Sequence, residues 1–324
     1  MKAIVYDHYG PPDVLQYQEI EKPIPAGDEI LIRVRASSAN PYDWHFIRGT
    51  PSFIRLFTGL RAPKSRRVGA DVAGVVEAVG GNVTSFKPGD AVIGMAPGSF
   101  AEYVCAPASS LALMPENLNW EQAASVPMAG TTALQGLRDK GKIQPGQHVL
   151  INGAAGGVGT FAVQIAKSFG ARVTGVCSTG NIEPVRSIGA DEVIDYTRES
   201  FINAAQRYDL LFDLVGNNPL SACLRVLHPN GTYIGCGGGG PDRRSIELLA
   251  SMLRSVVIAP FASQKMPSLF AKVNTADLTF LADLMRAGRV IPVLDRSYPL
   301  SETADAIRYL EQCHAHGKVV IKVA

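Results

Sequence analysis

The middle of the chain alternates short apolar runs with stretches of helical spacing. Apolar positions lead from His148 into a loop of Gly and Ala, and apolar residues then recur every three or four positions over 161–169. Three more apolar runs predict strands at 172–178, 192–196 and 208–216. Because strands and helices alternate at this pitch, we expect an α/β fold with a doubly wound parallel sheet.

Both ends of the chain have a β-rich texture that differs from the middle. Up to about residue 118, short apolar runs are separated by Pro, Gly and Asp, a pattern typical of a small bent barrel. The tail returns to this texture, so we expect the two ends to build one domain around an inserted one. We predict that residues 1–120 and 262–324 form the outer domain and that residues 121–261 form the inserted domain.

Helical patterns lie before and after the central strands. We expect Ser301 to cap the last helix and Gly288 to end the helix before it. The long irregular stretch 49–67 mixes basic and apolar residues and fits a lid, a partner-binding surface or an ordinary solvated loop. The other predicted elements are helices at 119–127, 131–139, 181–190, 219–227 and 246–254, and strands at 231–236 and 256–260.

Composition narrows the class of protein. With 324 residues, two domains are expected, and 46% hydrophobic with 19% charged residues is ordinary for a globular protein. A net charge of +2 favours neither nucleic acid nor a membrane surface as a partner. The 5 Cys form no C-x-x-C pair and indicate reduced thiols, and no apolar run reaches the length of a span or an export signal. We therefore expect a cytoplasmic protein.

The Gly-rich loop after the first central strand predicts a dinucleotide site. Glycines leave room for a diphosphate to approach the backbone, and free N–H groups at the start of the following helix favour an anion. A loop that serves only the turn is the alternative. The predicted contacts are Gly153, Ala155, Gly156, Gly157, Val158 and Gly159.

Ordered motifs along the whole chain resemble one family. They are NPYDWHFIRG at 40–49, GADVAGVVEAVG at 69–80, FKPGDAVIG at 86–94, GSFAEYV at 98–104, GAAGGVG at 153–159, SIGADEVIDY at 187–196 and HAHGKVVI at 314–321. Together they resemble the medium-chain dehydrogenase/reductase superfamily, in its zinc-free quinone reductase (zeta-crystallin-like) branch. The resemblance implies a Rossmann sheet inserted into a GroES-like catalytic domain. It also implies a homodimer that pairs through the strand at 256–260.

The zinc ligands of other branches are missing. Gly69-Ala70-Asp71 stands where zinc-bearing relatives have Gly-His-Glu, and SSANPYDW lacks their ligand Cys. Only Ala96–Gly98 replaces their four-Cys lobe. Zinc needs about four converging ligands, so we expect no metal.

Cofactor choice depends on the end of the second central strand. Residues 176–179 contain no carboxylate that would repel a 2′-phosphate, which favours NADPH, with NADH as the alternative. Gly180 departs from relatives with Lys or Arg there, and Arg186 or Arg198 is a substitute cation. The resemblance places Lys318 at the diphosphate; a solvated Lys in an edge strand is the alternative. The further predicted cofactor contacts are Ser178, Asn181, Tyr196, Gly216, Gly235 and Gly237.

Without a Lewis acid, hydride transfer requires an acceptor that is already electrophilic. Quinones and α,β-unsaturated carbonyls qualify, because the added charge spreads onto a distant oxygen. The resemblance makes Asn40, Tyr42, Asp43 and Thr132 the catalytic candidates. Their structural alternatives are an Asx turn for Asn40, a helix cap for Asp43 and a backbone hydrogen bond for Thr132.

Three functions remain open at this point. The first is a zinc-independent NADPH-dependent reductase of quinones or enones. The second is an NADPH-binding sensor or structural protein without turnover, since fold alone does not imply function. The third is an alcohol dehydrogenase-like enzyme on other carbonyls, which the missing zinc ligands disfavour.

Overall fold

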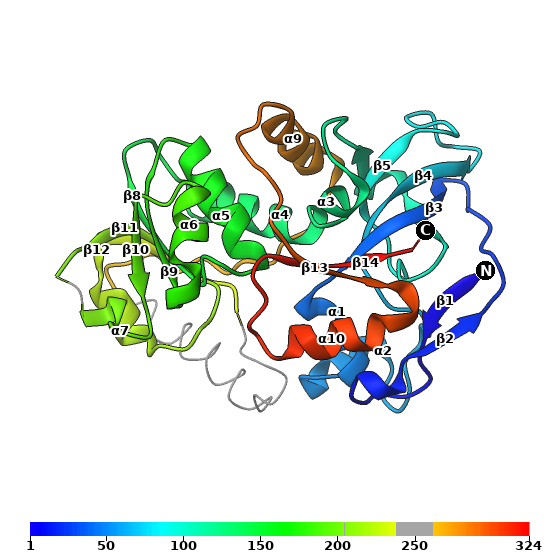
Figure 1. Cartoon of the computed structure of the whole chain (residues 1–324), viewed down its shortest axis with the longest axis horizontal. Coiled ribbons are helices and arrows are strands. Elements are labelled where there is room, and N and C mark those ends of the chain that lie inside the picture. The colour runs from blue at the N-terminus through cyan, green and yellow to red at the C-terminus, as the bar shows by residue number, and fades with distance from the viewer. Residues whose placement is uncertain (204, 238–261, 324) are drawn as a thin grey trace. The chain divides into compact units, whose positions relative to one another are not determined.

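The computed structural model describes residues 1–203, 205–237 and 262–323, and the chain forms two compact units (Figure 1). Unit 1 comprises Met1–Thr131, Lys272–Gly288 and Pro292–Ala324, and unit 2 comprises Thr132–Ala271 and Arg289–Ile291. Both chain ends thus belong to unit 1. The first boundary lies later than residue 120 because helix α3 (Trp120–Ala124) packs on the unit 1 sheet.

Unit 2 is built on a parallel sheet of five strands in the order β10-β9-β8-β11-β12. In the register, Leu150 of β8 pairs with Thr174 of β9 on one side and Leu211 of β11 on the other. This confirms the predicted doubly wound α/β fold. The strands are β8 (His148–Asn152), β9 (Arg172–Cys177), β10 (Glu192–Asp195), β11 (Tyr208–Asp213) and β12 (Leu227–Gly235).

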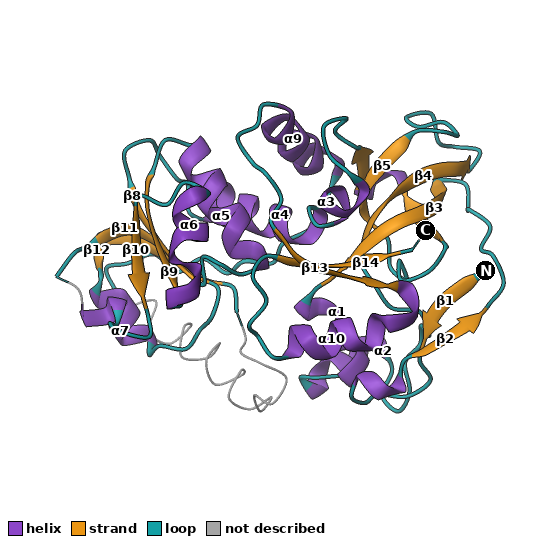
Figure 2. Ribbon diagram, in the orientation of Figure 1, coloured by secondary structure: helices purple, strands orange, loops and turns teal. Residues whose placement is uncertain are grey.

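Helices cover both faces of this sheet. Figure 2 shows α5 and α6 on one face and α7 on the other. α5 buries its apolar residues against β8 and β9, including Phe161 and Ile165 with no exposed surface. The helical elements are α5 (Gly157–Ser168), α6 (Ile182–Ser187), α7 (Leu220–Arg225), the π-helix Gln135–Lys140 and the 3-10 turns Thr179–Asn181 and Phe201–Asn203.

Unit 1 contains a strongly bent sheet and a two-stranded ribbon. The sheet runs in the order β13-β14-β3-β4-β5-β7, and β6 pairs with β3. Among the described strands of this sheet, β13 and β14 pair in parallel and the other pairs are antiparallel. The strands are β1 (Lys2–Val5), β2 (Gln16–Glu19), β3 (Glu29–Ala39), β4 (Asp71–Val79), β5 (Ala91–Met95), β6 (Tyr103–Pro107), β7 (Leu111–Leu113), β13 (Leu294–Pro299) and β14 (Lys318–Lys322).

Helices α1 and α10 of unit 1 pack against each other, and α10 also packs on β14. Trp44 and Ile47 of α1 share a buried cluster with Ile307 of α10 and Ile321 of β14. The barrel interior is a second apolar cluster around Ile32. The helical elements are α1 (Pro41–Arg48), α2 (Arg55–Thr58), α9 (Thr275–Arg286), α10 (Thr303–Glu311) and the 3-10 turns Pro12–Val14, Ser52–Ile54, Ala108–Ser110 and Leu300–Glu302, while α4 (Pro127–Leu134) spans the first unit boundary.

Two helix ends differ in how well they match the sequence-based expectation. Ser301 is not the cap of the last helix, because it lies inside a 3-10 turn and α10 begins at Thr303. Gly288, with φ +67, follows α9 as expected. The helix at 246–254 and the strand at 256–260 lie outside the described residues.

Candidate functional site

The turn between β8 and α5 in unit 2 leaves a helix N-terminus without a side-chain cap. Gly156 is the N-cap residue, and because glycine has no side chain it cannot cap the helix. The first bond of the helix runs from Thr160 N–H to Gly156 C=O at 3.0 Å. The N–H groups of residues 157–159 precede that bond and have no hydrogen-bond partner among the described residues, so they can bind an anion.

Two glycines allow this turn to form. Gly153 has φ +89, a left-handed conformation that side chains disfavour. A Cβ on Gly159 would lie 2.0 Å from the Gly153 carbonyl oxygen. The helix therefore starts closer to the turn than any other residue type would permit. The alternative is that the glycines serve the turn alone. It accounts for the shape of the turn but not for the N–H groups of residues 157–159, which have no partner among the described residues.

The neighbouring strand β11 ends in a buried carboxylate that sequence patterns did not single out. Asp213 accepts hydrogen bonds from the Asn152 side-chain amide (2.8 Å), the Tyr233 hydroxyl (3.1 Å) and the Gly216 N–H (2.9 Å). β8 and β11 lie where the strand order of the sheet reverses, which is where open α/β sheets bind ligands. The sequence signal that could have identified Asp213 is a carboxylate at the end of an apolar strand.

Three glycines shape the loops at these strand ends. Gly216 has φ +67, and Gly235 is the last residue of β12. A Cβ on Gly237 would lie 2.4 Å from the Leu214 carbonyl oxygen, so the loops after β11 and β12 are in close contact. Backbone groups thus line this edge of the sheet.

The predicted adenosine contacts follow β9 and β10. The buried Asn181 amide donates to Ser178 Oγ at 2.9 Å, and the Tyr196 side chain is 55% exposed. Both substitute cations have carboxylate partners: Arg186 pairs with Glu183 at 2.7 Å and Arg198 with Asp195 at 3.5 Å. A 2′-phosphate would therefore compete with carboxylates for these two guanidinium groups.

Asp195 is a second carboxylate that the sequence analysis missed. It accepts hydrogen bonds from the hydroxyls of Thr179 (2.6 Å) and Thr197 (2.8 Å). The bond from Thr179 holds the pKa of this carboxyl below its ordinary value. Since β10 pairs with β9, this carboxylate lies beside the strand end where we expected none.

Unit 1 contains a buried polar cluster that joins residues from opposite ends of the chain. The Asn40 amide nitrogen donates to Asp71 Oδ2 (2.9 Å) and to the Ser38 carbonyl (3.1 Å), and its Oδ1 accepts from Lys318 Nζ. Both amide hydrogens are therefore used inside the protein. Asn40 has no donor left for a substrate oxygen, and the interpretation as a catalytic donor does not fit this geometry.

Lys318 is the cation of this cluster. Its side chain is 3% exposed, and Nζ lies 3.6 Å from Asp71 Oδ2 and 3.3 Å from the Ala39 carbonyl oxygen. β14 lies between β13 and β3, so a solvated Lys in an edge strand is wrong. Burial lowers the pKa of this ammonium, and the Asp71 and Asp43 carboxylates oppose that shift. An ammonium held in this way does not fit the diphosphate contact that the resemblance implied.

Comparison with known proteins decides the family. The model of the alcohol dehydrogenase GroES-like domain matches residues 26–116, and that of the zinc-binding dehydrogenases matches residues 188–321. The chain is 34% identical over 336 residues to the NADPH-dependent alkenal/one oxidoreductase of Arabidopsis thaliana, which covers 99% of this chain and 79% of that protein. It is 31% identical over 335 residues to the quinone oxidoreductase of Sus scrofa, with 99% and 97% covered.

A solved structure agrees with this match. The quinone oxidoreductase of Coxiella burnetii superimposes with a TM-score of 0.86 at 31% identity, over 100% of this chain and 99% of that chain. The chain belongs to the quinone oxidoreductase branch of the medium-chain dehydrogenase/reductase superfamily. It is an oxidoreductase with a nicotinamide cofactor.

The zinc-binding dehydrogenase model also matches this chain, but the residues at 70 and 71 do not fit a zinc ion. Ala70 offers no ligand atom. Both Asp71 oxygens are occupied: Oδ1 accepts from the Met128 N–H at 2.9 Å, and Oδ2 faces Ser38, Asn40 and Lys318. A metal ion here would meet a buried ammonium, and like charges repel strongly at low dielectric.

Asp43, also predicted as catalytic, is a buried helix-capping residue in this quinone oxidoreductase homologue. Its Oδ2 accepts from the Asn40 N–H at 2.8 Å, which confirms the capping alternative. Its Oδ1 has no hydrogen-bond partner among the described residues. Burial raises the pKa of this carboxyl to about 8, with Asp71 adding to the shift and the Asn40 N–H and Lys318 opposing it.

We expect Asp43→Asn to flatten the dependence of stability on pH. In the wild type the folded pKa of about 8 lies above the ordinary 3.8, so the folded state binds the extra proton. The wild-type free energy of unfolding should therefore fall as pH rises from about 4 to 8. The amide keeps the acceptor for Asn40 N–H without titrating. Urea unfolding at several pH values measures this, and equal slopes for both proteins would contradict it.

Tyr42 is a catalytic candidate whose hydroxyl the cluster does not use. The half-buried Tyr42 hydroxyl has no hydrogen bond to any residue the structure describes, and its ring lies 4.2 Å from that of Phe46. Burial, with a smaller effect of Asp43, raises the pKa of Tyr42 to about 12, so the phenol stays protonated. Thr132 is 8% exposed within α4.

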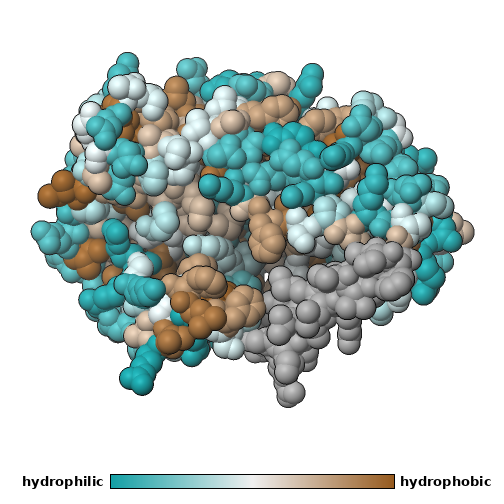
Figure 3. Space-filling view, turned by 180° about the vertical axis from the view of Figure 1, so that it is seen from behind, coloured by the Kyte–Doolittle hydropathy of each residue, from teal (hydrophilic) through white to brown (hydrophobic). Residues whose placement is uncertain are grey.

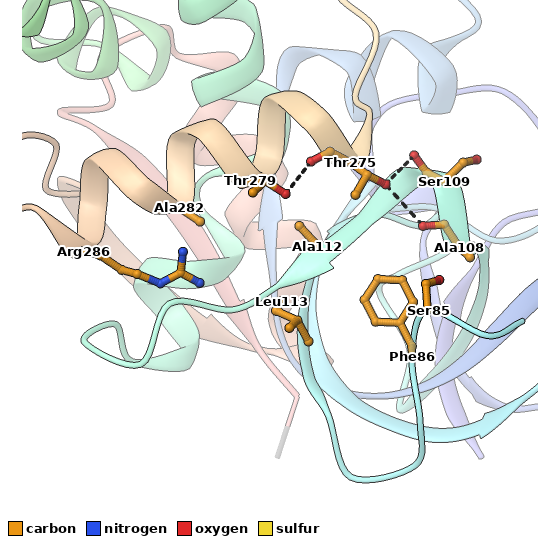
Figure 4. Close-up of a pocket in the computed structure, with 10 residues that line it drawn as sticks. All are labelled: Ser85, Phe86, Ala108, Ser109, Ala112, Leu113, Thr275, Thr279, Ala282 and Arg286. Atoms are coloured by element: carbon orange, nitrogen blue, oxygen red, sulfur yellow. Dashed lines mark hydrogen bonds between the residues drawn. The ribbon is translucent and has the colours of Figure 1, made fainter.

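A separate hollow of about 390 Å³ lies in unit 1 between α9 and β7 (Figure 4). Thr275 at its rim donates to the Ser109 carbonyl at 3.0 Å, and Arg286 pairs with Asp283 at 2.7 Å. The other lining residues are apolar or carry a hydroxyl group, and none of them is an acid or a thiol. We assign no chemistry to it.

Proposed function

We propose that the protein transfers hydride from NADPH to quinones or α,β-unsaturated carbonyls without zinc. The observation that carries this proposal is the Asp71–Lys318 pair, because an ammonium stands among the groups where a metal would polarise a carbonyl. The acceptor must then be electrophilic by itself. The printed names of the alkenal/one and quinone oxidoreductases support the same class of acceptor.

The chain offers groups suited to each part of the cofactor. The open N–H groups of residues 157–159 suit the diphosphate. Ser178, Asn181 and Tyr196 suit the adenosine end, and the backbone at Gly216, Gly235 and Gly237 suits the nicotinamide end. When bound, the cofactor supplies the hydride. The protein orients the ring and excludes water.

Tyr42 is the proposed donor to the acceptor oxygen. Hydride addition to a quinone or enone places negative charge on oxygen, and a positioned O–H stabilises that charge. The Tyr42 hydroxyl is neutral at physiological pH and free of partners among the described residues, which suits this role. For Thr132 we propose a contact to the nicotinamide.

We expect Tyr42→Phe to lower kcat/KM for a quinone by about 10- to 100-fold, as removal of a transition-state hydrogen bond does. The fold should be unaffected, because the hydroxyl has no partner in the described parts of the chain. Loss of NADPH absorbance at 340 nm measures the rate, and circular dichroism checks the fold. An unchanged kcat/KM would remove Tyr42 from the mechanism.

The proposed function is tested with purified protein and a panel of acceptors. NADPH and NADH are each assayed with an ortho-quinone, a para-quinone, a 2-alkenal and a simple aldehyde, with and without a chelator. We expect turnover of the first three acceptors, a preference for NADPH and no effect of the chelator. Tight NADPH binding without turnover would favour the sensor alternative. If the simple aldehyde is turned over and the chelator abolishes this activity, the alcohol dehydrogenase-like alternative is favoured.

Assembly and compartment are further proposals. We propose a homodimer, supported by the resemblance and measurable by light scattering. No disulfide joins the five cysteines among the described residues, which supports a reducing compartment such as the cytoplasm. Among the described residues, no helix is both long and apolar enough to cross a bilayer.

A further inference from the structure

The segment 52–60 in unit 1 has its polar face turned inward and its apolar face turned outward. Thr58 Oγ1 lies 2.8 Å from the Tyr9 hydroxyl, and Arg55 donates to the Gly49 carbonyl at 3.0 Å while stacking on the Tyr9 ring. These contacts hold the short helix α2 against the unit through its polar side chains. A helix that serves only the fold buries its apolar side instead.

The outward face consists of large apolar side chains. Leu56 and Phe57 lie in α2, Phe53 lies in the 3-10 turn before it, and Leu60 follows Gly59 at its end. In Figure 3, brown side chains gather at the lower left, where α2 lies in this turned view. The exposed fractions are 42% for Phe53, 64% for Leu56, 78% for Phe57 and 69% for Leu60.

The chain around this face is basic and contains no acid. Residues 44–70 include six Arg or Lys and neither Asp nor Glu, and two of the six, Arg48 and Arg66, pair with carboxylates of other segments. Arg61 and Lys64 are exposed and form no ion pair with the residues that the structure describes. The whole chain has a net charge of only +2, because acidic residues elsewhere offset the positive charge of this segment.

We propose that this surface, defined by Phe53, Leu56, Phe57, Leu60, Arg61 and Lys64, docks on an anionic lipid bilayer. Protruding apolar side chains with adjacent cations match the hydrocarbon boundary and the headgroups of such a bilayer. A protein partner would need a surface shaped to these separate protrusions, whereas lipids adapt to them. This departs from the expectation of no membrane partner.

The docking would bring the enzyme to its acceptor. This part rests on the proposed function: apolar quinones and long enones partition into bilayers, so an enzyme held at the surface meets them at high local concentration. Docking itself is independent of turnover. The two ideas can therefore fail separately.

The test is co-sedimentation of the full chain with vesicles. Vesicles of phosphatidylcholine mixed with phosphatidylglycerol are compared with vesicles of phosphatidylcholine alone. We expect binding to the anionic vesicles that is at least about ten-fold stronger and that weakens with added salt. Leu56→Ser with Phe57→Ser, and separately Arg61→Gln with Lys64→Gln, should each reduce it by about ten-fold or more.

Ile24→Ser is the matched control, since Ile24 is 88% exposed in the same unit but outside this surface. It should bind vesicles like the wild type. All variants should turn over a water-soluble quinone normally. Wild-type turnover without vesicle binding would overturn the docking alone, and vesicle binding without turnover would overturn the proposed function alone.

Two other occupants have distinct signatures. If the Leu56 and Phe57 substitutions reduce the mass seen by light scattering, the surface is an interface between copies of this chain. If they raise KM for the soluble quinone and leave vesicle binding intact, it is a substrate lid. Either result overturns the proposal.

Discussion

Replacing Lys318 with Met is expected to lower the free energy of unfolding by about 3–5 kcal/mol, the cost of leaving a buried charge without its partner. The substitution keeps the side chain's length and removes the ammonium. Asp71 would then remain buried with Ser38, Asn40 and the Met128 N–H as its hydrogen-bond donors, but without a cation. Urea unfolding measures the loss.

A neighbouring lysine in the same strand supplies the control. Lys322 also lies in β14 and pairs with Glu121 at 2.8 Å, but its side chain is 55% exposed. Lys322→Met should therefore cost only about 0–1 kcal/mol. If both substitutions cost the same small amount, the buried pair is hydrated in solution and the Lys318 ammonium does not exclude a metal ion at Asp71.

A double variant separates the pair from the packing around it. Combining Lys318→Met with Asp71→Asn removes both charges, so the combined loss should be smaller than the sum of the single losses by about 0.5–3 kcal/mol. Additive losses would mean that each residue acts through its own packing. The single Asp71→Asn variant completes the cycle.

Local patterns in the sequence were sufficient for the strands and the glycine turn of unit 2. The strand expected at 172–178 is β9 (Arg172–Cys177), and the glycine turn lies between β8 and α5 as predicted. Each of these features is determined by residues within a few positions of one another. Apolar periodicity and glycine spacing report directly on such features.

The polar cluster of unit 1 could not be found in this way. Lys318 and Asn40 are 278 positions apart, and nothing near either residue indicates the other. Sequence reasoning therefore assigned Asn40 to the substrate and Lys318 to the cofactor, whereas the sheet pairs β14 with β3 and brings them together. The Asp43 cap, which depends only on its spacing from Asn40, was among the stated alternatives.

Side-chain direction explains the remaining differences. The stretch 49–67 was ambiguous because its composition does not say which face packs on the protein. Tyr9, far away in the sequence, decides this by holding Thr58 and Arg55. Ser301 illustrates the same limit at a helix end, since Thr303 bonds to the Leu300 carbonyl within the turn and the helix starts later.

Gly159→Ala is expected to weaken NADPH binding by about 10- to 100-fold, which corresponds to the 1–3 kcal/mol typical of overpacking. The added methyl would lie 2.0 Å from the Gly153 carbonyl oxygen and 2.9 Å from Ala154 Cα. Relief of that overlap requires the turn to move, and the N–H groups of residues 157–159 then lose their alignment toward the diphosphate. NADPH fluorescence titration measures the affinity.

Gly180→Ala is the matched control, because the same methyl group there meets no atom within 4 Å. It should leave both affinity and stability unchanged. If Gly159→Ala binds NADPH like the wild type while retaining its fold, the diphosphate does not depend on this helix start. If instead both variants weaken NADPH binding equally, an added methyl group near the cofactor is enough to weaken it, and the contact with the Gly153 carbonyl oxygen is not the cause. Selective loss in Gly159→Ala would tie cofactor affinity to the close approach of α5 to the turn, and so to the glycine spacing from which the unit was first inferred.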